Sequence, residues 1–233
     1  MIEVELKFAL PADVRAPLQA RLDALPSLRR LMPVENVDIY YDTSDFACLQ
    51  QAVFLRIRDS DRLEIKYHEQ DDPTHTHATE QTFPLMAEAF LMQDLNTLCS
   101  RFIPDWRHGD TVKDALVIND LRAFVSIEKR RARYVNEQLS LCLDQVADLG
   151  DFFEAELLCA DETGIEQAQA QLEAFVADLA LPALSLVRVG YVELWLRSHL
   201  PQVYRLGKYQ VENAVPVSAS APMRKDAFMQ KRG

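Results

Sequence analysis

The feature of this sequence that most constrains the fold is a charge at every second residue in successive strand-like segments. In the opening segment, Glu3, Glu5 and Lys7 alternate with Val4 and Leu6. Successive side chains of a strand point to opposite faces, so this segment would place its charges on one face and its apolar residues on the other. The alternation recurs along the chain at these positions: Arg56, Arg58, Glu64, Lys66, Glu80, Lys129, Arg131, Arg133, Asp144, Glu154 and Glu156.

One such strand would be explained by a polar face turned to water. A set of six or seven, in which arginine is frequent and the intervening residues are mostly Val, Leu, Ile and Phe, favours another arrangement. An α+β fold containing a β-barrel, charged inside and covered outside by helices, produces this pattern. Buried charges cost free energy unless they pair or bind ions, so we expect a ligand inside the barrel.

Composition limits the size of this fold and its partners. With 233 residues, of which 48% are hydrophobic, the chain can bury one large core or two small ones. The charged strands extend from residue 3 to residue 156, which favours one domain. The net charge of −11 argues against general electrostatic binding to nucleic acid or to a membrane surface.

The sequence also predicts a compartment. No apolar run approaches the roughly 18 residues of a membrane span, and Met1 leads directly into a strand rather than into a signal segment. We therefore expect a cytoplasmic protein. The cysteines show no C-x-x-C spacing and lie in mostly apolar surroundings, which predicts reduced core thiols. They are Cys48, Cys99, Cys142 and Cys159.

Periodicity divides the chain into elements. Helices are predicted over residues 11–25, 85–101, 110–120 and 162–179, the last of which should pack on the outside of the sheet. Strands are predicted over residues 37–41, 49–58, 62–68, 79–85 and 123–135. Residues 69–78 form a predicted loop, in which we expect His75 and His77 to be exposed rather than to bind metal. From about residue 213 we expect a mobile tail.

The charged groups are those that phosphate chemistry requires. Arg forks and Lys ammonium groups recognise phosphate, and its hydrolysis needs cations that neutralise charge and position water. Carboxylate oxygen is the ligand that Mg²⁺ and Mn²⁺ prefer, and same-face pairs on a strand lie about 6.5 to 7 Å apart. A glycosidase would not need so many bases, and no G-x-S-x-G elbow or Gly-rich phosphate loop is present. A structural barrel held by internal ion pairs remains physically possible.

Several motifs, in order along residues 1 to 200, resemble one known family. The start E-V-E-L-K matches the E-x-E-x-K signature of the CYTH, or triphosphate tunnel metalloenzyme, superfamily. Further matching segments are Y-Y-D-T, L-R-I-R, L-E-I-K, K-R-R-A-R-Y, L-D-Q-V-A-D-L-G-D-F-F-E-A-E and V-G-Y-V-E-L-W. The resemblance implies an eight-stranded antiparallel β-barrel that encloses a triphosphate. It implies a tunnel domain over residues 1–200 and a C-terminal extension over residues 201–233.

Within the superfamily, the chain looks most similar to the thiamine-triphosphatase branch, in I-E-V-E-L-K-F, Y-Y-D-T-S-D-F-A-C-L-Q and L-P-Q-V-Y-R. The segment D-L-G-D-F-F-E-A-E equally resembles bacterial class IV adenylate cyclases. The family usually has a Lys shortly before its S-Y or G-Y pair, whereas S-L-V-R-V-G-Y offers Arg188 as the nearest base. Tyr41 is either a hydroxyl near the phosphates or a packed aromatic residue.

The resemblance implies a Mg²⁺- or Mn²⁺-dependent triphosphatase acting on thiamine triphosphate, inorganic triphosphate or a related small triphosphate. The predicted metal ligands are Glu3, Glu5, Asp144, Glu154 and Glu156. The predicted substrate contacts are Lys7, Arg56, Arg58, Lys66, Arg131 and Arg188. The predicted catalytic residues are Glu3, Glu5, Lys7 and Lys66.

Glu64, Glu80, Lys129 and Arg133 are expected to modulate this network or to pair with one another. The alternatives are a class IV-type adenylate cyclase, which forms cyclic AMP and pyrophosphate from ATP, and a protein that binds phosphate or polyphosphate without turnover. The expected partner is a small-molecule triphosphate, with no nucleic acid and no membrane, and the protein is expected to be a monomer or a homodimer.

Overall fold

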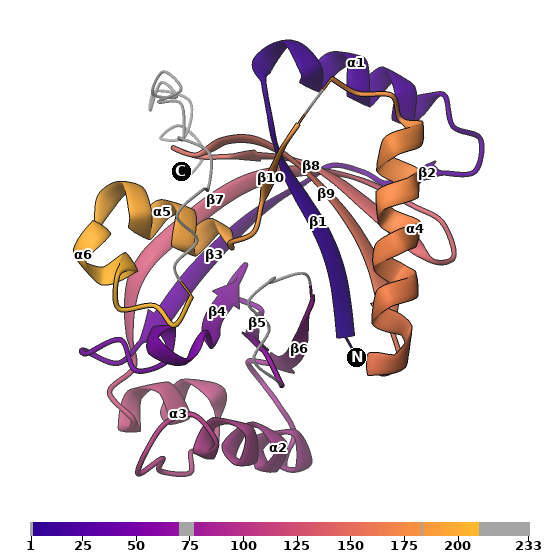
Figure 1. Ribbon diagram of the computed structural model, residues 1–233. Helices are drawn as coiled ribbons and strands as arrows, with labels where there is room; N and C mark the ends of the chain where they lie inside the picture. Colours follow the sequence, from indigo (N-terminus) through magenta and orange to yellow (C-terminus); the bar gives the residue numbers. More distant parts are fainter. Residues whose placement is uncertain (1, 70–76, 183, 210–233) are drawn as a thin grey trace, which may run out of the picture.

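The computed structural model describes residues 2–69, 77–182 and 184–209 (Figure 1). The strands are β1 (Ile2–Leu10), β2 (Arg29–Arg30), β3 (Val34–Asp42), β4 (Phe54–Arg58), β5 (Arg62–Tyr67), β6 (His77–Pro84), β7 (Arg122–Val135), β8 (Leu139–Val146), β9 (Gly150–Cys159) and β10 (Ser185–Val187). The α-helices are α1 (Ala12–Asp23), α2 (Ala89–Ser100), α3 (Val112–Ile118), α4 (Ile165–Asp178), α5 (Tyr191–His199) and α6 (Pro201–Tyr204). Two short 3₁₀ turns are η1 (Leu49–Gln51) and η2 (Glu162–Gly164).

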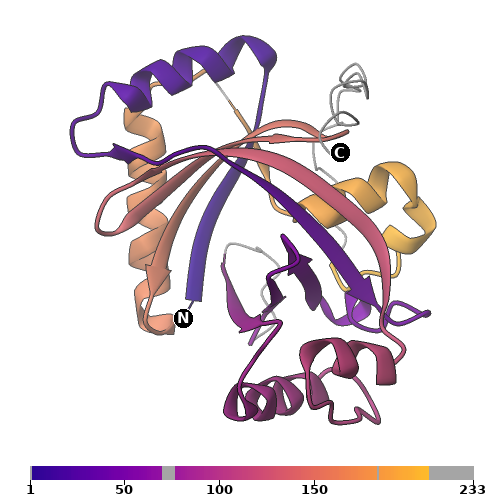
Figure 2. The ribbon, with the colours of Figure 1, turned by 180° about the vertical axis from the view of Figure 1, so that it is seen from behind.

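Eight of the strands close into an antiparallel barrel, in the order β1-β6-β5-β4-β3-β7-β8-β9 and back to β1. The closure is the pairing of β1 with β9, which runs from Ile2 opposite Cys159 to Leu10 opposite Asp151. Two short strands lie outside this circuit: β10 pairs with β1 beyond the end of its pairing with β6, and β2 pairs with β7. The predicted eight-stranded antiparallel barrel is confirmed, and Figure 2 shows it from behind.

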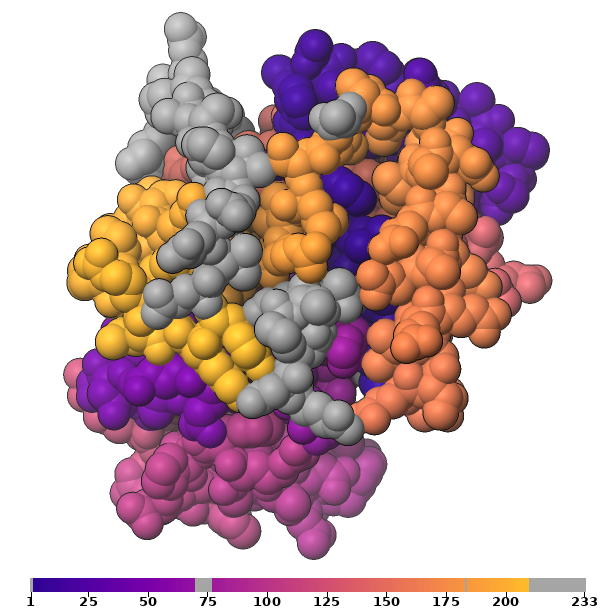
Figure 3. All heavy atoms as spheres, viewed as in Figure 1, coloured from indigo at the N-terminus to yellow at the C-terminus, as the bar shows by residue number. Residues whose placement is uncertain are grey.

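Helices cover the outside of the barrel in two places. Helices α1 and α4 pack on the outward, apolar residues of β1, β8 and β9, where Leu18 of α1 and Leu172 of α4 are fully buried. Helices α2 and α3 pack on the outward residues of β4 and β5, where Leu63 and Leu95 are almost fully buried. Figure 3 shows α4 and the α2–α3 pair on separate parts of one face of the molecule. The prediction of helices packed outside the barrel is therefore confirmed.

Helix α5 belongs to a third apolar cluster, which lies among inward-facing residues. Its Leu194 packs in this cluster with Val125 and Ile127 of β7 and with Phe152 of β9. On both strands these apolar positions precede the charged ones in the same inward row, so one end of the barrel is filled with apolar side chains. The residue that caps the start of the helix is Gly190, whose backbone N–H donates to the Glu193 carboxylate at 2.7 Å. No sequence pattern had predicted this helix.

The remaining predictions differ from the structure mainly at element boundaries. Residues 49–51 form a 3₁₀ turn rather than the start of a strand, and β6 begins at His77, inside the segment predicted as a loop. His75 and the predicted mobile tail lie outside the described residues. All four cysteines are buried and form no disulfide bond. No helix in the described part of the chain is long and apolar enough to cross a membrane.

Candidate active site

The inward rows of the barrel strands line a cavity of about 470 Å³. Ten of the eleven predicted site residues line it, and only Asp144 does not. The ten are Glu3, Glu5, Lys7, Arg56, Arg58, Lys66, Arg131, Glu154, Glu156 and Arg188. The structure thus brings residues from both ends of the barrel sequence into one enclosure.

Three carboxylates form a cluster on one wall of the cavity. Glu3 and Glu5 of β1 and Glu156 of β9 each offer an oxygen within 4.8 Å of the other two. Burial and repulsion by Glu3 raise the pKa of Glu156 to about 8. Two bases adjoin the cluster, because Lys7 Nζ lies 2.7 Å from Glu5 Oε1 and Lys66 Nζ lies 3.4 Å from Glu3 Oε2. Crowded carboxylate oxygens that repel one another fit a hard divalent cation, which would relieve that repulsion.

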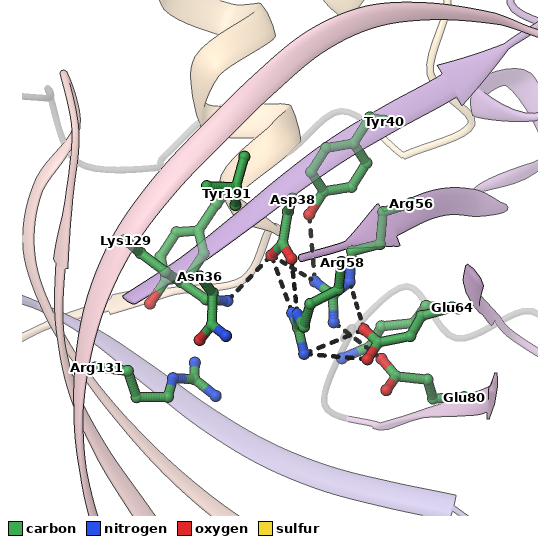
Figure 4. Close-up of polar contacts among 12 residues, drawn as sticks. Asn36, Asp38, Tyr40, Arg56, Arg58, Glu64, Glu80, Lys129, Arg131 and Tyr191 are labelled. Atoms are coloured by element: carbon green, nitrogen blue, oxygen red, sulfur yellow. Dashed lines mark hydrogen bonds and ion pairs between the residues drawn. The ribbon is translucent and has the colours of Figure 1, made fainter. Parts of the chain in front are cut away.

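Arginines of β4 form a second group, opposite an acid that the sequence analysis had missed (Figure 4). Arg58 makes a two-pronged pair with Asp38 of β3, at 2.7 Å from Nε and 2.9 Å from Nη2. Arg56 donates from Nε to Glu64 at 2.8 Å, and Lys129 Nζ lies 3.3 Å from Asp38. Burial alone would raise the pKa of Asp38, but Arg56, Arg58 and Lys129 outweigh it and hold this pKa well below its usual value.

Arg131 of β7 lies between two acids of the neighbouring strands. Its guanidinium donates to Asp144 at 2.8 Å from Nε and 2.6 Å from Nη2, and it also contacts Glu154. The Tyr191 hydroxyl at the start of α5 donates to the same Asp144 carboxylate at 2.9 Å. The Lys7 ammonium lies 4.9 Å from the centre of the Tyr191 ring. Asp144 is fully buried, and in this structure it anchors Arg131 rather than joining the carboxylate cluster.

The sequence analysis missed several buried residues at the site, among them Asp38, Tyr40, Tyr191 and Glu193. Asp38 and Tyr40 alternate on β3, so the same period-2 rule could have found them. Arg56 donates to the Tyr40 hydroxyl at 3.3 Å, whereas Tyr41 packs in the apolar cluster beneath α2 and α3. The open question about Tyr41 is thereby answered in favour of a packed aromatic residue.

The acids whose role was uncertain are placed as partners of the arginines. Glu64 pairs with Arg56, Arg58 and Arg62, and Glu80 pairs with Arg56 at 3.2 Å. Arg188 follows β10, is exposed and lines the same cavity. The arrangement can hold a polyanion, because phosphate oxygens bind Arg and Lys in the same geometry as these carboxylates do.

The comparisons with known proteins agree with this architecture. The CYTH domain matches residues 1–191, so the chain belongs to the CYTH family. The PH1819 protein from Pyrococcus horikoshii has a similar structure, with a TM-score of 0.60 and 21% identity over 84% of this chain and 99% of that chain. A putative adenylate cyclase from Vibrio parahaemolyticus also has a similar structure, with a TM-score of 0.56 and 16% identity over 84% of this chain and 98% of that chain. A search of curated proteins found no match.

A third similar structure is a putative adenylyl cyclase from Hippeastrum, described as having a dominant triphosphatase activity. It gives a TM-score of 0.52 with 17% identity over 92% of this chain and 99% of that chain. At these identities the similarity shows a common fold. Membership in the CYTH family identifies the chain as a triphosphate-processing enzyme of a family that generally uses a divalent metal.

Proposed function

We propose that the protein is a divalent-metal-dependent triphosphatase that removes the terminal phosphate of inorganic triphosphate, thiamine triphosphate or a related small triphosphate. The observation that carries this proposal is the division of one enclosed cavity into two parts. The oxygens of Glu3, Glu5 and Glu156 gather within 4.8 Å of one another, while Arg56 and Arg58 line the same cavity from β4, which β6 and β5 separate from β1. Metal-assisted phosphoryl transfer needs both parts together.

The carboxylates would hold Mg²⁺ or Mn²⁺. Glu3, Glu5, Glu154 and Glu156 line the cavity and are available to it. Asp144 completes the predicted set in this proposal, because a triphosphate bound to Arg131 would release the Asp144 carboxylate from its present pair. The ion would neutralise phosphate charge and lower the pKa of an attacking water.

The bases would orient the substrate by exchanging partners. Arg56, Arg58 and Arg131 donate hydrogen bonds to carboxylates in the structure. Their planar guanidinium groups can donate the same hydrogen bonds to phosphate oxygens instead. Lys7 stays protonated, because Glu5 and Glu154 outweigh the effect of burial and raise its pKa. It would therefore act as a donor to phosphate. Catalysis would come from positioning and charge neutralisation, without a covalent intermediate.

The test is a product assay with three substrates. Purified protein is incubated with inorganic triphosphate, thiamine triphosphate or ATP, with Mg²⁺, with Mn²⁺ or with EDTA, and orthophosphate and cyclic AMP are both measured. The proposal expects metal-dependent orthophosphate release from at least one small triphosphate, much faster than formation of cyclic AMP. Activity that persists fully in EDTA would contradict the metal mechanism.

The second candidate is a class IV-type adenylate cyclase, supported by the fold shared with the putative Vibrio enzyme. The Hippeastrum protein, which carries the cyclase description but a dominant triphosphatase activity, supports the hydrolase instead. Cyclic AMP and pyrophosphate as the main products from ATP would favour the cyclase. A binding protein without turnover is less well supported, because a carboxylate cluster beside the bases weakens the binding of an anion.

A further inference from the structure

The inward row of bases on β7 extends further toward solvent than the row of acids facing it. Lys129, Arg131 and Arg133 follow one another at every second residue, and all three line the cavity. The side chains of the first two are 2% and 16% exposed, whereas Arg133 is an exposed residue. The row therefore runs from the interior of the barrel, next to the apolar cluster of α5, to the mouth of the cavity.

The acidic row on β9 ends at a residue that is less exposed than Arg133. Glu154 and Glu156 have side-chain exposures of 4% and 15%, and the next inward position is Leu158, which is 65% exposed. On β8 the residue opposite Arg133 is Cys142, and the hydroxyl of Ser140, the next inward position of β8, accepts a hydrogen bond from Arg133 Nε at 3.2 Å. At the mouth, the partner of Arg133 is therefore a hydroxyl group rather than a carboxylate.

Arg133 consequently differs from the bases deeper in the cavity. Lys129 and Arg131 each pair with a carboxylate, but among the described residues no carboxylate lies within ion-pair distance of Arg133. Glu137, in the β7–β8 connection, is exposed and lines the same mouth without pairing with Arg133. An anion can therefore bind Arg133 without displacing an internal partner.

The length of the row indicates which anion this is. Alternate residues of a strand lie about 6.5 to 7 Å apart, which is more than twice the distance between adjacent phosphorus atoms of a phosphate chain. A triphosphate that lies along this row from Lys129 would end near Arg131, and one or two further phosphates would reach Arg133. A thiazolium ring at the same place would bring a positive charge next to the guanidinium.

We infer that the cavity prefers linear inorganic polyphosphates longer than triphosphate, and that Arg133 binds the phosphate beyond the third. This inference rests on the proposed function for the orientation of the chain, since it takes the terminal phosphate to lie deepest. It names the substrate class as an extended polyanion rather than a triphosphate with a cationic organic group.

Equilibrium binding tests the inference independently of turnover. Isothermal titration calorimetry in EDTA, at one fixed ionic strength, compares triphosphate, tetraphosphate and thiamine triphosphate on the wild type, Arg133→Gln, Arg133→Lys and Arg130→Gln. Arg130 is the matched control, because it neighbours Arg133 on β7 and is exposed on the outward face. Circular dichroism checks that each variant is folded.

We expect the wild type to bind tetraphosphate more tightly than triphosphate. Arg133→Gln should weaken tetraphosphate binding by roughly three- to tenfold, as for one exposed charge-assisted contact, and triphosphate binding by less than about twofold. Arg133→Gln should leave the affinity for thiamine triphosphate unchanged or higher. Arg133→Lys should keep part of the preference for tetraphosphate over triphosphate. Arg130→Gln should change none of these affinities.

Equal losses for triphosphate and tetraphosphate, or no preference in the wild type, would overturn the inference. An equal loss in Arg130→Gln would do the same, because it would reduce the effect to general surface charge. The proposed function fails separately: if the binding pattern holds but no phosphate chain is hydrolysed with Mg²⁺ or Mn²⁺, the inferred binding preference stands and the triphosphatase proposal is wrong.

Discussion

At the scale of single residues, each central base of the barrel interior is paired with an acid. Arg58 forms two hydrogen bonds with Asp38, and Lys7 Nζ lies 2.7 Å from Glu5. Removing one partner of a buried pair is strongly unfavourable, although the intact pair itself contributes little net stability. A substrate must therefore replace carboxylates that already bind the same bases, and its affinity is the difference between two similar sets of contacts.

Glu5→Gln removes one charge from the carboxylate cluster and hardly changes the side-chain volume. We expect metal-dependent turnover to fall by roughly a hundredfold, the upper range for changes at groups that support a metal site, while circular dichroism shows a folded protein. Glu128→Gln, at an exposed and outward position of β7, is the control and should retain wild-type rates. Loss of the fold in Glu5→Gln would instead assign Glu5 a structural role.

Asp38→Asn should lower the free energy of unfolding by about 3 to 5 kcal/mol at pH 7, because it leaves Lys129 without its buried anion and Arg58 with Glu64 alone. The folded state holds the pKa of Asp38 below its ordinary 3.8, so its contribution is present above that pH and is lost as the pH falls further. Urea unfolding should show the gap between wild type and variant narrowing below pH 3.8. A gap independent of pH would contradict this account. Glu35→Gln, exposed on β3, is the control.

At the scale of elements, α5 joins the apolar end of the barrel to the charged site. Leu194 packs in the apolar cluster, while Tyr191, three residues earlier, holds Asp144 and lies beside Lys7. A shift of this helix would therefore disturb Arg131 through Asp144. The helices on the outer face pack through their apolar residues on the outward side of the barrel wall, and Arg15 of α1 contacts Asp144 only at its backbone carbonyl, at 3.0 Å.

Variants of two leucines of similar burial can distinguish the role of α5 at the site from the role of an outer helix in stability. Leu194→Ala in α5 and Leu172→Ala in α4 should each lower the free energy of unfolding by about 2 to 5 kcal/mol. We expect kcat/KM to fall roughly tenfold in Leu194→Ala, because a small misplacement of site residues is costly, and less than twofold in Leu172→Ala. Steady-state kinetics at a temperature where both variants are folded is the measurement. Equal kinetic losses would mean that α5 acts only through global stability.

At the scale of the whole molecule, the net charge of −11 gives no hint of a site for a polyanion. The bases that would bind it come from β1, β4, β5 and β7 and meet only inside the barrel. A bound phosphate chain would therefore connect strands around most of the wall. Its effect should appear as stabilisation of the complete fold rather than of one segment.

Triphosphate with Mg²⁺ should accordingly raise the melting temperature. At a free concentration 100 times the dissociation constant, linkage gives about 2.7 kcal/mol of added stability. Orthophosphate at the same concentration should stabilise the protein less, since it reaches fewer of the bases. Thermal unfolding with and without EDTA measures this effect, and a shift that is identical for the two anions would contradict a site built for a chain.

The sequence predicted the inward rows and the barrel, because alternation is a local property of each strand. It could not assign partners: Arg131 pairs with Asp144 through strand register, and Asp144 therefore lies apart from the carboxylate cluster that it was expected to join. Tyr191 was missed because its role depends on a helix whose residues contact strands far away in the chain. The third apolar cluster, to which α5 belongs, was missed for the same reason.

The closing pair of the barrel has a consequence for biosynthesis. Because β1 pairs with β9, Glu5 at the start of the chain lies opposite Glu156. A nascent chain therefore cannot pair β1 with β9 until more than 150 residues have left the ribosome, and such long-range pairing is intrinsically slow. During that interval its alternating charges discourage association between unfinished chains. The carboxylate cluster is complete only when β9 has paired with β1.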